Sequence, residues 1–78
     1  MTAPATYRWF ALTKTQRRVL LTLPDGWQPR NDQQVMPATR KVLVRLGLLE
    51  VERSSGRLMY RLTEFGGEVR EAGKEGTT

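Results

Sequence analysis

The sequence predicts a small α+β domain that is mainly helical, with three to four helices and one antiparallel β-hairpin. Two observations carry this prediction. Apolar residues recur with the helical period of about 3.6 residues at 12–23 and 37–46, and with the strand period of about 2 at 49–62. A chain of 78 residues leaves room for one hydrophobic core, so we expect one domain of modest stability.

The first predicted helix covers residues 14–23. Thr13 precedes it and Gln16 follows three residues later, a capping-box pattern that satisfies two amide donors at a helix start. Pro24 then ends the helix. The residues that share its core side are Leu12, Gln16, Val19, Leu20 and Leu23.

Residues 27–36 show no clear periodicity, because Pro29 interrupts the pattern and a run of polar residues follows. Asn31 is expected to cap a single short turn there. The next segment, residues 37–46, is the best-defined helix, because Pro37 suits the first helical position and a glycine ends the pattern. Its core side is formed by Thr39, Val42, Leu43 and Leu46, and its outward side by Ala38, Arg40, Lys41, Val44 and Arg45.

Residues 49–62 are predicted to form a hairpin with one apolar face, because apolar and polar residues alternate on both sides of a turn at 54–56. Trp9 or Phe10 is expected to pack with Trp27 over the first helix. The rest of the predicted core consists of Leu20, Leu43, Leu46, Leu49, Val51, Leu58, Tyr60 and Leu62.

The last predicted helix covers residues 64–72, with Thr63 as its cap and a glycine pair that weakens it. Both ends of the chain are small, polar and rich in proline or glycine. We therefore expect a domain at 7–72 with flexible segments at 1–6 and 73–78.

The charge balance favours an anionic partner. The chain has 13 basic and 8 acidic residues, a net charge of +5, and the basic residues are concentrated before residue 62. The last segment is net acidic, but its glutamates lie three to four residues apart beside Arg70 and Lys74. This spacing is typical of a solvated helix face.

The residue inventory excludes most catalytic chemistry. Without cysteine or histidine the chain cannot form a zinc finger, a disulfide, a thiolate nucleophile or a histidine general base. It shows no nucleophile with a base, no metal cluster and no glycine-rich phosphate loop. We expect no enzymatic activity, no cofactor and no small-molecule substrate.

Nothing in the sequence indicates a membrane. The longest apolar run, residues 19–21, is far below the roughly 20 residues that a membrane span needs. The first four residues lack the charged and apolar regions of a signal peptide. The expected location is the cytoplasm, with no membrane partner.

Three passages follow one another in a characteristic order: LTKTQRRVL at residues 12–20, TRKVLVRLGLLE at 39–50 and YRLTEFG at 60–66. Together they resemble winged helix-turn-helix proteins of the MarR-like type, in which a recognition helix runs into a β-hairpin wing. The sequence departs from that family at residues 28–34, which are polar where a two-turn apolar segment is usual. The long dimerisation helices of such repressors are also absent, so a homodimer would need other surfaces.

The resemblance implies a small transcriptional regulator that binds duplex DNA, with residues 37–46 as the recognition helix and 49–62 as the wing. A helix with cations on its outward side also fits a major groove physically. The expected DNA contacts are Arg40, Lys41, Arg45, Arg53, Arg57 and Arg61. Additional phosphate contacts are expected from Lys14, Arg17, Arg18 and Arg30.

Two alternatives stay open at this point. The cations of the predicted recognition helix would also suit an ordinary solvated face. The same fold can serve instead as a protein-binding module, an adaptor or inhibitor that does not bind DNA, with its interface centred on Leu21, Val44 or the N-terminal aromatic residues.

Overall fold

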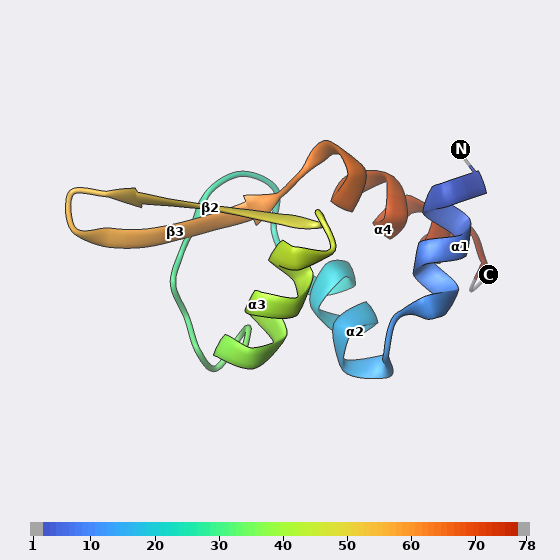
Figure 1. The fold of residues 1–78 in the computed structure, drawn as a ribbon, viewed down its shortest axis with the longest axis horizontal. Helices are drawn as coiled ribbons and strands as arrows, with labels where there is room; N and C mark the ends of the chain where they lie inside the picture. The colour runs from blue at the N-terminus through green and yellow to red at the C-terminus, as the bar shows by residue number, and fades with distance from the viewer. Residues whose placement is uncertain (1–2, 77–78) are drawn as a thin grey trace.

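The computed structural model describes residues 3–76 and shows an α+β fold that is mainly helical. The elements of this part of the chain are α1 (Ala3–Ala11), α2 (Lys14–Thr22), β1 (Gln28–Pro29), α3 (Pro37–Arg45), β2 (Leu49–Ser54), β3 (Arg57–Leu62) and α4 (Glu64–Gly76). The predicted class, with its helices and antiparallel hairpin, is confirmed. Figure 1 shows the helices gathered toward one end and the hairpin projecting from the other, in a molecule of 38 × 21 × 20 Å.

The three strands form one antiparallel sheet in the order β1-β3-β2, so β3 is central. β2 and β3 make the predicted hairpin, in which Val51 lies opposite Tyr60. Its turn consists of Ser55 and Gly56, whose φ angles of 51° and 77° suit a type I′ turn. Ser54, which the pattern assigns to the turn, is the last residue of β2.

The sequence pattern does not indicate β1. Gln28 pairs with Tyr60 and Pro29 with Met59 of the central strand. The next residue, Arg30, donates its backbone N–H to a β3 carbonyl at 2.9 Å. A strand of two residues is too short to show an alternating pattern in the sequence. It is recognised only by its pairing with β3.

The N-terminal segment corrects the expectation of flexible residues at 1–6. Residues 3–6 form the start of α1, Ala5 is completely buried, and residues 1–2 lie outside the described part of the chain. Trp9 is buried as expected, but its ring packs on α4 at Gly73, while Phe10 is exposed. The burial of α1 against α4 explains why this short helix forms.

α2 begins as predicted. Thr13 Oγ1 accepts a hydrogen bond from the N–H of Gln16 (3.2 Å), and the Gln16 side chain accepts one from the N–H of Thr13 (3.0 Å), so the capping box is complete. Val19 and Leu20 are buried, and the helix ends one residue before Leu23. The predicted phase and boundaries of this helix are therefore confirmed to within one residue.

The core forms where the base of the hairpin meets α2, α3 and α4. The buried hydrophobic residues there include Leu20, Val35, Leu43, Leu48, Leu49, Tyr60 and Val69. Leu46 and Leu62 pack against them and are partly buried, and Leu58 is half-buried. The strand alternation places Val51 in this core, but Val51 is 42% exposed. Val51 lies on the edge strand β2, whereas its buried partner Tyr60 lies on the central strand β3.

α4 starts as predicted, because Thr63 Oγ1 accepts a hydrogen bond from the N–H of Gly66 at 2.9 Å. It continues to Gly76, so the segment at 73–76, expected as a flexible tail, is helical in the structure; residues 77–78 lie outside the described part. Gly66 has a packing role in this helix, because a Cβ there would collide with the backbone carbonyl of Leu48.

Candidate nucleic-acid interface

The exposed side of α3 carries most of the residues that the helical pattern assigns to it. Pro37 occupies the first turn, and Gly47, with φ of 78°, follows the C-cap residue. Leu43 faces the core and is completely buried. The exposed residues of the opposite side are Ala38, Lys41, Val44 and Arg45.

Arg40 does not lie on this exposed side, which corrects the expectation that it points outward. It is only 9% exposed. At about 100° per residue Arg40 is about 60° from Leu43, at the border of the buried face, where a long aliphatic stem can pack while the guanidinium turns to a partner. The partner is Asp32, whose Oδ1 lies 3.7 Å from Arg40 Nη1.

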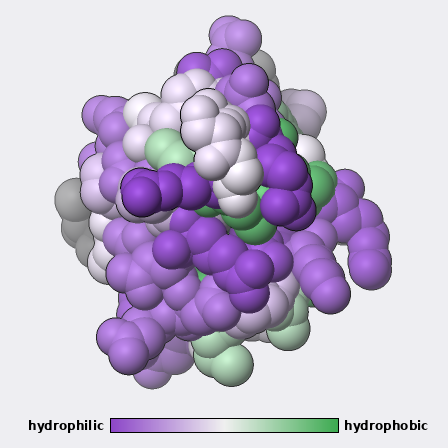
Figure 2. Space-filling view, turned by 90° about the vertical axis from the view of Figure 1, so that its left-hand side faces the viewer, coloured by the Kyte–Doolittle hydropathy of each residue, from purple (hydrophilic) through white to green (hydrophobic). Residues whose placement is uncertain are grey.

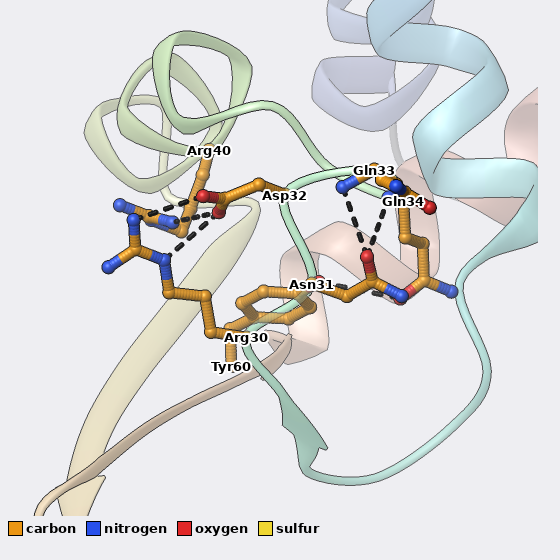
Figure 3. Close-up of polar contacts among 7 residues, drawn as sticks. All are labelled: Arg30, Asn31, Asp32, Gln33, Gln34, Arg40 and Tyr60. Atoms are coloured by element: carbon orange, nitrogen blue, oxygen red, sulfur yellow. Dashed lines mark hydrogen bonds and ion pairs between the residues drawn. The ribbon is translucent and has the colours of Figure 1, made fainter.

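Asp32 also binds Arg30. The three side chains form a cluster that connects the segment before α3 to Arg40 of that helix. Arg30 donates from Nε and Nη2 to both carboxylate oxygens, at 3.0 and 3.1 Å. Figure 3 shows both guanidinium groups directed at this single carboxylate. Arg40 Nη1 is buried and has no hydrogen-bond partner. Its positive charge is compensated by the ion pair with the Asp32 carboxylate.

Asn31 holds the turn that carries Asp32. Its Oδ1 accepts hydrogen bonds from the N–H groups of Gln33 (3.0 Å) and Gln34 (3.2 Å), and its carbonyl accepts one from Val35 at 2.9 Å. This is the single capped turn that the sequence predicts there. The sequence carries one signal for the cluster, which is that Asp32 is the only acidic residue between Asp25 and Glu50.

The cluster shifts the acidity of its members. Hydrogen bonds from the Arg30 guanidinium hold the pKa of the Asp32 carboxyl below its usual range, and the charges of Arg30 and Arg40 act in the same direction. The same hydrogen bonds raise the pKa of Arg30. Burial raises the pKa of the Tyr60 hydroxyl, which donates to Gln34 Oε1 at 3.4 Å. Asp32 therefore stays ionised over the whole neutral range.

The three wing arginines are divided between the two faces of the hairpin. Arg53 lies opposite Leu58, on the face that carries Tyr60, whereas Arg57 and Arg61 occupy the other face. All three are exposed. Sequence reasoning treats them as one group, but the strand alternation cannot bring all of them to one surface.

Of these three arginines, Arg61 is the one whose charge is paired within the domain. It forms an ion pair with Glu50 on the neighbouring strand, and its guanidinium lies 4.5 Å from the centre of the Trp27 ring. Both contacts are within the domain, so Arg61 has a structural role as a cap over Trp27. Arg57 is exposed beside the turn, opposite Ser54.

The structure brings Arg30 and Arg57 together in a way that the sequence does not indicate. They line a hollow of about 300 Å³ with Pro29 and Leu58, along the edge of β3 where β1 ends. Figure 2 looks onto the end of the molecule that carries the hairpin and shows a mostly hydrophilic surface with a small hydrophobic area. Two arginines thus lie at this hollow, and one of them, Arg30, is paired with Asp32.

Of the expected phosphate contacts on α2, Arg18 lines a hollow with Met36 and Thr39 at the start of α3. Arg17 donates from Nε to the carbonyl of Trp9 and from Nη2 to that of Phe10, both at 3.1 Å, and so caps the last turn of α1. Lys14 and Arg18 are exposed on the same helix. Figure 1 shows α2 beside α3, on the side away from the hairpin.

No protein-family model matches this chain, and no curated protein or solved structure is significantly similar to it. The case for a function therefore depends on its own residues. Within residues 3–76, no three histidine, cysteine or acidic side chains gather closely enough to hold a metal ion. Over the same range no helix is both long and apolar enough to cross a membrane.

Proposed function

We propose that this chain is a winged helix-turn-helix domain that binds duplex DNA with the exposed side of α3 and with the hairpin. The observation that carries the proposal is the combination of two features. α3 contains no acidic residue and turns Lys41 and Arg45 to solvent. Beside it, a hairpin that projects beyond the helices carries Arg57 next to its turn.

The dimensions of α3 support a role in the major groove. An α-helix fits that groove, and nine residues extend about 13 Å, enough to cross the groove floor. In this proposal Lys41 and Arg45 contact bases or phosphates, and Arg53 and Arg57 contact phosphates or the minor groove from the two faces of the wing. Arg30 joins Arg57 at the shared hollow.

The role of Arg40 changes in this proposal. Its guanidinium is buried against Asp32, so it positions the N-terminal half of α3 and does not read DNA. A carboxylate next to the interface also lowers the local positive potential. The carboxylate therefore weakens non-specific binding of anions near Arg40. Lys41 and Arg45 remain as the cations of α3 that can contact a duplex.

A protein-binding role is the second candidate, and one observation favours it. Val44 lies beside Lys41 on the outward side of α3 and is 37% exposed, and Met36 just before the helix is exposed as well. An apolar interface would use these residues as anchors. The two candidates differ in how the complex responds to salt, because only DNA binding releases many counterions.

The test is a fluorescence-anisotropy titration of a labelled duplex at about 50 and 200 mM KCl. If four phosphates are contacted, affinity falls about 100-fold between these concentrations. We expect the Lys41→Gln/Arg45→Gln variant to bind more weakly and with a smaller salt slope. The matched control is Arg8→Gln/Lys14→Gln, which removes the same charge from α1 and α2. Equal losses for the two variants, or no salt-dependent binding by the parent, would overturn the proposed interface.

A further inference from the structure

The molecule has a second exposed surface on α1 and α2, at the end away from the hairpin (Figure 1). We call it the α1–α2 face. It contains large apolar side chains that no part of the described chain covers: Tyr7 is 76%, Phe10 64% and Leu21 40% exposed. These are three of the six large hydrophobic residues that are exposed among the described residues, so the face is an unusually apolar part of the surface.

A hollow lies beside the apolar residues of this face, and Leu21 is part of its lining. Tyr7 and Phe10 are three residues apart and therefore share one side of α1. The guanidinium of Arg17 lies 5.4 Å from the Trp9 ring centre and 6.0 Å from that of Phe10. Arg17, Trp9 and Leu21 in turn line a hollow of about 320 Å³ between the two helices. Phe10 is not part of this lining but contacts it through Arg17.

The charge around this hollow has one sign. Neither α1 nor α2 contains an acidic residue, and together they contain four cations: Arg8, Lys14, Arg17 and Arg18. The last three line the hollow. An occupant must therefore offer an apolar side chain for the hollow and negative charge around it.

We propose that the α1–α2 face docks an acidic amphipathic helix of a partner protein. The hollow is at the lower end of the volume range of ligand pockets, about 300 to 1,000 Å³, and suits one aromatic or leucine anchor. Flanking glutamates or aspartates of the partner helix then meet Lys14 and Arg18. This is the helix-in-groove mode of recognition, in which apolar anchors recur every three or four residues.

Other occupants fit this face less well. A second copy placed symmetrically would bring the same four cations against themselves, which opposes association. A bilayer surface cannot fill a hollow between two helices, and a DNA backbone has no apolar group to offer it. The inference does not depend on DNA binding, because it uses neither α3 nor the hairpin.

The test uses the full chain and a fluorescent synthetic peptide, an amphipathic helix with tryptophan and leucine on one side and glutamates along both flanks. The control peptide carries lysine in place of each glutamate. We expect the acidic peptide to bind and the lysine peptide not to bind. Phe10→Ser and Leu21→Ser should each weaken binding about fivefold or more. Val51→Ser, which removes an exposed apolar residue from the hairpin, should leave the affinity unchanged.

Circular dichroism melting of each variant separates loss of binding from loss of folding, and two variants at different positions guard against one that fails to fold. The proposal is overturned if the acidic peptide does not bind, or if folded Phe10→Ser and Leu21→Ser bind like the parent. It is also overturned if duplex DNA or phosphatidylserine vesicles displace the peptide. Sedimentation that shows a dimer which Phe10→Ser dissociates would assign the face to a second copy instead.

Discussion

Nη1 of Arg40 on α3 lies 3.7 Å from Oδ1 of Asp32, which belongs to the turn before that helix. The turn and the helix are thus connected by a charge pair of which one member is buried. Arg30 binds the same carboxylate through two hydrogen bonds. The pair adds to the completely buried Val35, which anchors the same segment in the core before α3.

This pairing predicts opposite effects for its two members. Asp32→Asn should lower the melting temperature, because it leaves the Arg40 guanidinium buried without a counter-charge. Arg40→Met should keep or raise it, because an apolar side chain of similar length fills the same space. In the Arg40→Met background, Asp32→Asn should cost less than in the parent, and thermal melting of all four proteins measures this coupling. Additive effects would show that the pair does not act as a unit.

The same variants test the assignment of Arg40 as a positioning residue. Arg40→Met should retain its salt slope for duplex DNA, since a buried guanidinium makes no phosphate contact. A slope reduced by about one phosphate equivalent would instead return Arg40 to the interface.

The lowered pKa of Asp32 predicts a specific acid response. The pKa in the folded chain is below the ordinary value of 3.8, so the stability that the cluster contributes is present above that pH and is lost as the pH falls through the folded pKa. Thermal melts of the parent and of Asp32→Asn between about pH 6 and pH 2 should therefore converge at the acid end. A constant difference in melting temperature at every pH would contradict the role of this carboxylate.

The adjacent glycines of α4 should respond in opposite directions to alanine. Gly66→Ala places a methyl group against the Leu48 carbonyl and should destabilise, because backbone cannot move aside easily. A methyl group at Gly67 would meet no neighbouring element within 4 Å, and Gly67→Ala should stabilise by about 0.5 to 1 kcal/mol through better helix propensity. Chemical denaturation of both variants measures the difference, and destabilisation by both would argue against the close approach.

Leu43 and Val51 form a matched pair for testing the core. Leu43 is completely buried, so Leu43→Ala should destabilise by about 2 to 5 kcal/mol. Val51 is substantially exposed on the edge strand β2, and Val51→Ala should cost much less. Urea denaturation compares them directly, and equal losses would mean that the hairpin is covered in solution.

Arg57 and Arg61 separate binding from folding within the wing. Arg57→Gln should leave the melting temperature nearly unchanged and reduce the salt slope for duplex DNA by about 0.9. Arg57→Lys should recover only part of the loss at A·T-rich sites, because a hydrated ammonium enters a narrow minor groove less readily. Arg61→Gln should lower the melting temperature instead, since it removes the Glu50 pair and the contact with Trp27. If Arg57→Gln lowered the melting temperature and Arg61→Gln reduced the salt slope, Arg57 would have the structural role and Arg61 would contact DNA.

Local patterns in the sequence determined the elements whose causes are local. The capping box at Thr13 and Gln16, the proline and glycine at the two ends of α3 and the alternation along the hairpin each involve residues within a few positions of one another. Their periodicity also predicts which side of α2 and α3 is buried, apart from Arg40. Helix starts, turns and amphipathic faces are short-range properties, so a single chain displays them.

Only the tertiary structure decided the features that depend on distant residues. α1 is stabilised by α4 from the opposite end of the chain, and β1 exists through its pairing with β3. The burial of Arg40 depends on where the preceding turn places Asp32, and the exposure of Val51 depends on the position of β2 at the edge of the sheet. Each of these follows from which surfaces meet in three dimensions, and side-chain periodicity along the chain does not contain that information.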